Sequence, residues 1–148
     1  MTARRFIGAL LLALLLISGS RGAAMAEQVL WLQAKDPRNW QVVAGGAAGE
    51  LRYDPAQGVF RFSAHGLAPQ SDYALVRHND KPRDGQVLAV GRSDLDGQLQ
   101  LQGNWQLWSQ KFWLLPVADL TLEGSRAELK AWHPRHYLFE NRRLGEDG

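Results

Sequence analysis

The sequence predicts an all-β protein, built as a two-sheet antiparallel β-sandwich of about seven to nine strands. Three observations lead to this fold class. Short runs in which apolar and polar residues alternate recur through residues 27–140, and a period of two is typical of strands. Glycine, proline, asparagine or aspartate divides the runs every eight to twelve positions. An apolar stripe of helical period is missing from this part of the sequence.

Residues 1–26 have the pattern of a secretory signal peptide. Arg4 and Arg5 precede an unbroken apolar run at residues 6–17, and small residues follow up to Ala26, which is the arrangement of a cleavable signal. The run is shorter than the ~20 residues that a membrane-spanning helix needs. We therefore expect cleavage after Ala26 and export to the periplasm or the exterior, with an uncleaved anchor as the alternative.

The charge of the chain changes once the leader is set aside. The whole sequence has 17 basic and 15 acidic residues, whereas residues 27–148 have 14 basic and 15 acidic residues, a net charge of −1. Because these residues have no basic stripe, we expect no nucleic-acid partner. The sequence has no cysteine, which excludes disulfides, thiolate metal sites and thiol catalysis. We expect one domain at residues 27–140, with no cofactor and no membrane segment after the leader.

The first half of this domain is expected to form four strands. A capped turn at residues 36–40, with Asp36 as N-cap and Pro37 in the first helical position, separates the first strand from the second. The expected strands are residues 29–34, 40–43, 49–54 and 59–65. Alternation points five side chains of the last two strands into the core. These inward side chains are Leu51, Tyr53, Phe60, Phe62 and Ala64.

The second half of the domain is expected to complete the two sheets. A polar loop at residues 79–85 and a tight turn at Asp96-Gly97 separate strands there. Residues 111–117 are apolar on both faces, which favours a central strand. We expect residues 141–148 to be a polar, frayed tail. The expected strands are residues 73–78, 87–93, 98–105, 111–117, 120–122, 128–132 and 137–140.

A short motif at residues 66–75 resembles the corner of fibronectin type III-like and chordin-type sandwiches. Leu67, Pro69 and Tyr73 precede a strand in this motif. Leucine packs inward, proline fixes the bend, and a buried tyrosine returns its hydroxyl to the backbone across the corner. The resemblance implies a fold class and no activity.

A broader resemblance follows from blocks in the same order along the chain: residues 40–53, the corner, residues 93–97, residues 111–116 and residues 132–140. They resemble a family of exported prokaryotic all-β proteins without an assigned activity, whose closing motif is Trp-Asn-Pro-x-x-Tyr-Leu-Phe-Glu. This chain carries Trp132, Pro134 and Tyr137 of that motif and has His133 where asparagine is common. The resemblance implies export and an all-β fold, and it carries over no catalytic residue.

Two groups of residues are candidate metal ligands. His133 and His136 are three positions apart, but Pro134 favours an extended His133, and residues three apart in an extended chain point to opposite sides. Asp94 and Asp96 precede a glycine, as at the start of a calcium loop, but the remaining carboxylate ligands of that loop are missing. Surface histidines and a hairpin turn are therefore the favoured interpretations.

The sequence has six tryptophans, and two of them lie in a loop-like stretch. Trp105 and Trp108 follow a row of uncharged outward residues, Gln98, Gln100 and Gln102. Exposed aromatic rings beside polar side chains are suited to binding a sugar or a protein. The alternative interpretation is that both rings fill the core.

The sequence contains none of the motifs of nucleophilic hydrolases, nucleotide-binding enzymes or zinc proteases. Our leading hypothesis is therefore an exported, non-enzymatic binding or interaction module for a protein or a glycan, with Trp105, Trp108 and the glutamine row as the ligand surface. The alternative is a metal-binding accessory protein that uses the surface histidines or the Asp94/Asp96 turn.

Overall fold

The computed structural model describes residues 27–78 and 84–145, which form ten strands and two short 3₁₀ turns. The predicted signal peptide and most of the predicted polar loop lie outside these residues. The strands are β1 (Gln28–Gln33), β2 (Ala48–Asp54), β3 (Val59–His65), β4 (Asp72–His78), β5 (Asp84–Arg92), β6 (Leu99–Asn104), β7 (Lys111–Pro116), β8 (Leu120–Glu123), β9 (Arg126–Leu129) and β10 (Leu138–Glu140). The turns are η1 (Val117–Asp119) and η2 (Pro134–His136).

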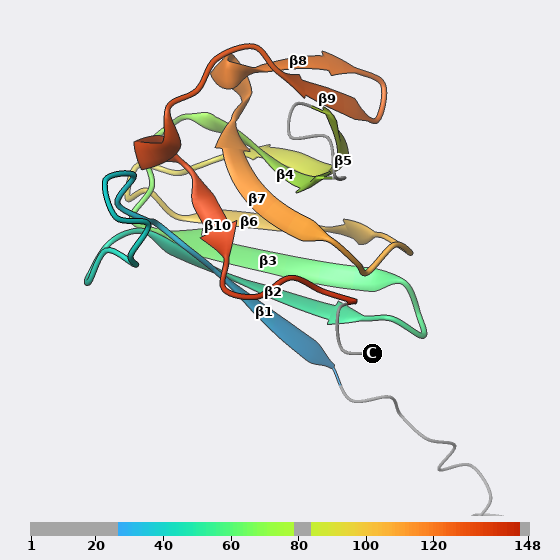
Figure 1. The fold of residues 1–148 in the computed structure, drawn as a ribbon. Helices are drawn as coiled ribbons and strands as arrows, with labels where there is room; N and C mark the ends of the chain where they lie inside the picture. Colours follow the sequence, from blue (N-terminus) through green and yellow to red (C-terminus); the bar gives the residue numbers. More distant parts are fainter. Residues whose placement is uncertain (1–26, 79–83, 146–148) are drawn as a thin grey trace, which may run out of the picture.

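All ten strands belong to one antiparallel sheet, in the order β6-β3-β2-β1-β10-β7-β4-β5-β9-β8. The all-β antiparallel prediction is confirmed, but in place of a sandwich of seven to nine strands there is one sheet curled into a half-barrel (Figure 1). The reason is β10, which pairs with β1 through Leu32 and Glu140 and with β7 through Phe139 and Trp113. This short strand joins two groups of strands that would otherwise be separate sheets. Within the described ranges, no helix is long and apolar enough to cross a membrane.

The half-barrel encloses the larger of two hydrophobic cores. The five side chains that alternation points inward from β2 and β3 are all buried in it, as predicted. A smaller core lies on the opposite face of β4 and β7, under the β8–β9 hairpin, and contains Ala74, Val76, Leu115 and Phe139. Because β7 pairs with both β10 and β4 and has a core on each side, the prediction of a central strand at residues 111–117 is confirmed.

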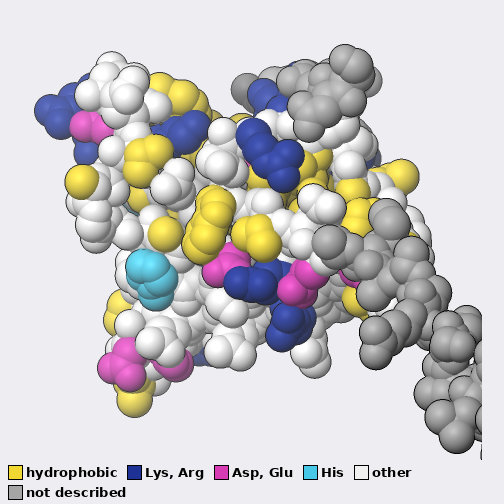
Figure 2. All heavy atoms as spheres, turned by 90° about the horizontal axis from the view of Figure 1, so that it is seen from below, with side chains coloured by type: hydrophobic (Ala, Val, Ile, Leu, Met, Phe, Trp, Pro, Cys, Tyr) yellow, Lys and Arg dark blue, Asp and Glu magenta, His cyan; other side chains and the backbone are white. Residues whose placement is uncertain are grey.

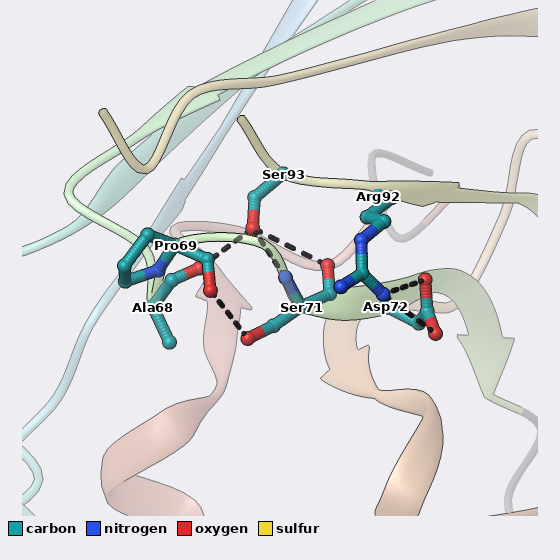
Figure 3. Close-up of polar contacts among 6 residues, drawn as sticks. All are labelled: Ala68, Pro69, Ser71, Asp72, Arg92 and Ser93. Atoms are coloured by element: carbon teal, nitrogen blue, oxygen red, sulfur yellow. Dashed lines mark hydrogen bonds and ion pairs between the residues drawn. The ribbon is translucent and has the colours of Figure 1, made fainter. Parts of the chain in front are cut away.

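The corner before β4 is held by two buried side chains, Tyr73 and Ser93, and Figure 3 shows the contacts of Ser93. The Tyr73 ring is buried, and its hydroxyl accepts a hydrogen bond of 3.1 Å from the Ala68 backbone N–H. The Ser93 hydroxyl donates to the Ala68 carbonyl at 2.6 Å and accepts from the Ser71 backbone N–H at 3.0 Å. The corner is therefore tied to the end of β5 as well as to its own strand.

The turn between β5 and β6 packs against the same corner. The Asp94 carboxylate accepts hydrogen bonds from the backbone N–H groups of Asp96 and Gln98, each at 2.9 Å. Gly97 has a φ of 74° and accepts a hydrogen bond from the Leu67 N–H at 3.1 Å. A Cβ atom on Gly97 would lie 2.3 Å from the Leu67 carbonyl oxygen, so this turn requires glycine.

Two expectations for the chain differ from the structure. Residues 40–43 form only an isolated bridge, Lys35 to Val42, because Trp40 has a φ of 61° and interrupts the extended run. The start of the expected frayed tail is packed: Leu144 is buried and pairs with Gln110. Apolar burial of one leucine thus extends the ordered domain to residue 145.

Candidate functional site

The predicted ligand surface is divided between two faces of the structure. Trp105 and Trp108 are half-buried against the larger core, and the Trp108 ring stacks on Tyr53 with 4.2 Å between centroids. The row of Gln98, Gln100 and Gln102 is exposed. Alternation continues beyond β6, so residue 105 faces inward with Leu99 and Leu101 while the glutamines face outward. The two tryptophans therefore pack toward the larger core while the glutamines face solvent, and a ligand surface made of both stays a prediction.

The outer face of β1, β2 and β3 is a solvated face with paired charges. Glu27 lies 3.0 Å from Arg61 and 3.4 Å from Arg52, which also pairs with Glu50. Figure 2 shows acidic and basic side chains next to each other on this side of the molecule. Cross-strand ion pairing explains these residues without a ligand.

The candidate metal ligands lie in two separate places. Asp94 and Asp96 belong to the β5–β6 turn, where the Asp94 carboxylate caps backbone N–H groups. The His133 and His136 rings lie on the same side of η2, with 6.0 Å between centroids. The expectation that they point apart is wrong, because Pro134 begins a 3₁₀ turn, in which residues three apart are aligned. Across the described residues, no group of three or more His, Cys, Asp or Glu side chains is placed to hold a metal ion.

Two exposed tryptophans, Trp40 and Trp132, point to a different surface. Five rings form an aromatic cluster outside β7 and β10, namely Trp40, Trp113, Trp132, Tyr137 and Phe139. Phe139 and Tyr137 are buried, whereas Trp132 is 52% exposed at the edge of the cluster. The Trp132 ring centroid lies 6.0 Å from that of Trp113 and 5.4 Å from that of Tyr137. The cluster thus contains two large rings that water still reaches, Trp132 and Trp40, of which Trp40 is 44% exposed.

Trp132 forms one wall of an open groove with a volume of about 780 Å³. The groove lies between β7, the β8–β9 hairpin and the segment that follows β9. Its volume is within the range of about 300–1,000 Å³ that small-molecule sites occupy. Its main lining residues are Trp113, Thr121, Glu128, Leu129, Lys130 and Trp132. Two indole rings therefore lie beside a hydroxyl, a carboxylate and an ammonium group.

A buried network fixes the segment that carries Trp132. The Asp119 carboxylate is buried at the end of η1 and accepts a hydrogen bond of 2.5 Å from the Tyr137 hydroxyl. The same hydroxyl accepts from the His133 backbone N–H at 2.9 Å, and His133 Nδ1 lies 3.0 Å from the carboxylate. Burial, followed by the hydrogen bond to Asp119, raises the pKa of Tyr137. Asp119 was not predicted as a functional residue, although an acid within the apolar residues 112–122 was a signal.

Two further polar side chains, His78 and Glu140, lie beside Trp113 of the aromatic cluster. His78 is 2% exposed, its ring centroid is 4.2 Å from that of Trp113, and neither ring nitrogen has a hydrogen-bond partner among the described residues. Burial, with a smaller contribution from Lys111, lowers the pKa of His78 to about 4. Burial also raises the pKa of Glu140. His78 is therefore a neutral core residue at pH 7.

The fold and the groove define an antiparallel all-β half-barrel with an aromatic-lined surface site. No protein family model, no curated protein and no solved structure matches the chain. The family resemblance of the closing block thus stays a prediction. The groove combines apolar ring faces with hydrogen-bonding side chains, an arrangement suited to recognition of a ligand.

Proposed function

We propose that the protein is an exported, non-enzymatic binding module that binds a glycan in the groove beside Trp132. Export is supported by the signal-peptide pattern of residues 1–26. A sugar ring has an apolar face that packs on an indole and hydroxyl groups that need hydrogen bonds. The groove offers both kinds of contact within one concave surface.

The observation that carries the proposal is the exposure of Trp132. A tryptophan that is 52% exposed leaves much of its apolar surface in water, which disfavours the free protein. Its contacts with Trp113 and Tyr137 hold the ring on one side. A ligand that covers the other side gains apolar contact without having to order a flexible side chain.

The polar lining supports a sugar over a flat apolar ligand. The Thr121 hydroxyl can donate and accept, the Glu128 carboxylate accepts, and the Lys130 ammonium donates. Thr121 and Glu128 are directly opposite each other in the β8–β9 pairing. Their side chains therefore project to the same side of the hairpin and can contact neighbouring hydroxyls of one sugar residue.

The test is titration of the protein with three soluble tetrasaccharides: cellotetraose, maltotetraose and the tetramer of N-acetylglucosamine. We expect at least one of them to bind, observed by tryptophan fluorescence and calorimetry. Trp132→Ala should weaken that binding by about tenfold or more, since one lost ring contact is worth roughly 1.4 kcal/mol. Trp132→Phe should retain part of the affinity.

Trp31→Ala is the matched control, because Trp31 is 47% exposed on the outer face of β1, away from the groove. We expect this variant to bind as the parent protein does. Binding of none of the three sugars, or equal affinity in Trp132→Ala and the parent, would overturn the proposal.

A further inference from the structure

The closing segment holds two imidazole rings side by side at the surface. The His133 and His136 ring centroids are 6.0 Å apart, the ring planes are inclined by 24°, and both residues are exposed. We infer that these two histidines form an exchangeable site for a divalent transition metal, with Cu²⁺ as the preferred ion. This site is separate from the groove and does not depend on the glycan proposal.

The backbone fixes the pairing of the two rings. Pro134 begins η2, the His136 N–H donates to the His133 carbonyl at 2.9 Å, and the Tyr137 N–H donates to the Pro134 carbonyl at 3.2 Å. In a 3₁₀ turn, side chains at positions i and i+3 are eclipsed. The rings therefore lie together without any movement of the main chain.

The buried Asp119 carboxylate orients the His133 ring and favours the tautomer that can bind a metal. Asp119 lies 3.0 and 3.1 Å from Nδ1 of His133. A neutral His133 that donates its proton to Asp119 from Nδ1 keeps an unprotonated Nε2, which is the nitrogen that coordinates a metal. A carboxylate on the distal nitrogen is the usual partner of metal-binding histidine. Asp119 is itself held by Tyr137 at 2.5 Å, so it acts as a positioning residue.

The spacing of the two rings is compatible with one bound ion, and the ligand type favours copper. With metal–nitrogen bonds of about 2.0–2.1 Å, the centroids of two imidazoles on one ion are separated by at most roughly 6.5 Å, and the observed 6.0 Å lies within that limit. Imidazole suits Cu²⁺, Ni²⁺ and Zn²⁺, and Cu²⁺ binds most tightly in this series. Water completes the coordination of a two-histidine site.

One acidic and one basic side chain lie next to the two histidines and act on a bound cation in opposite directions. The Asp119 carboxylate faces His133 and attracts the ion. Arg135, between the two histidines, repels the ion. The acid thus offsets part of the repulsion from the guanidinium group.

The test is titration of the full chain with CuCl₂, followed by calorimetry and by electron paramagnetic resonance of the bound ion. We expect one site per chain, with hyperfine coupling to two nitrogens. His133→Ala and His136→Ala should each weaken binding by at least about tenfold and leave one coupled nitrogen. Both rings are exposed, so these variants should fold, and His136→Gln is a second variant at that position.

His65→Ala is the matched control, since His65 is an exposed histidine on β3. It should bind Cu²⁺ as the parent protein does. Asp119→Asn should weaken binding by about 10- to 100-fold and shift the pH dependence of copper binding, which a purely structural role would not do. Unchanged affinity in His133→Ala and His136→Ala, loss of binding in His65→Ala, or fewer than two coupled nitrogens in the parent would overturn the inference.

Discussion

Replacing Tyr137 with phenylalanine removes one hydroxyl group that holds the closing segment in place. The hydroxyl donates to the Asp119 carboxylate at 2.5 Å and accepts from the His133 backbone N–H at 2.9 Å. The Tyr137 side chain is fully buried, so water cannot replace the lost partner. In the variant, the Asp119 carboxylate still contacts the His133 ring. The His133 backbone N–H loses the hydroxyl that accepted its hydrogen bond.

The cost of this change follows from the two bonds. A hydrogen bond to a charged group contributes about 1.5–3 kcal/mol, and the part-buried bond from the His133 N–H adds about 1 kcal/mol. We therefore predict that Tyr137→Phe lowers the free energy of unfolding by about 2–4 kcal/mol, a large part of the ~5–15 kcal/mol of a typical domain. Tyr73→Phe is the matched control: its buried hydroxyl accepts one uncharged bond of 3.1 Å from Ala68, so we expect a loss of about 0.5–1.5 kcal/mol.

The two variants are compared by equilibrium unfolding in guanidinium chloride at pH 7, with equal m-values as the check that the unfolded states match. The pH dependence gives a second readout. Because the pKa of Tyr137 is raised in the folded state, its contribution to stability is complete below the ordinary tyrosine pKa of about 10 and is lost as pH rises above it. Tyr137→Phe should lack that loss. If Tyr137→Phe costs no more than Tyr73→Phe, the carboxylate does not anchor the closing segment.

Two further predictions concern the stability of the half-barrel. Gly97→Ala should cost more than about 2 kcal/mol, since the new Cβ atom would lie 2.3 Å from the Leu67 carbonyl oxygen at a φ of 74°. Gly124→Ala, at a φ of 56° with open space around it, should cost only about 1 kcal/mol, and equal losses in thermal unfolding would refute the steric reasoning. The pKa of His78 is lowered to about 4, so its neutral form stabilises the fold above pH 6.5 and about 3 kcal/mol is lost as pH falls from 6.5 to 4. His78→Leu should remove that pH dependence, and a parallel decline of stability in both proteins would contradict the assignment.

The alternation of residues 59–65 illustrates what could be predicted of the fold. A period of two assigns each side chain to a face, and Phe60, Phe62 and Ala64 are buried as expected. Alternation does not say which strand lies beside which. The bridging position of β10 depends on pairing with β1, more than 100 residues earlier, as the bond from Trp31 to Asn141 illustrates. One curled sheet therefore could not be distinguished from two.

The candidate site was harder to predict, because exposure of an aromatic ring is a tertiary property. Trp108 lies in a loop-like stretch but stacks on Tyr53 inside the larger core. Trp132 belongs to the closing block and is exposed, because Tyr137 and Asp119 anchor the segment beside it. Asp119 lies 14 residues before His133. Composition and spacing indicated tryptophans and polar side chains as candidates for a binding surface, and the fold decides which of these side chains lie together.

The most direct test of the aromatic groove is the ratio of tetrasaccharide affinities between Trp132→Ala and Trp31→Ala, measured by calorimetry on the sugar that binds the parent protein. Trp132 and Trp31 are similarly exposed, at 52% and 47%. Any effect on binding that comes only from removing an exposed indole ring is therefore the same in both variants. We predict that Trp31→Ala retains the parent affinity and that Trp132→Ala loses about tenfold or more. Equal affinities in the two variants would contradict a glycan site in the groove.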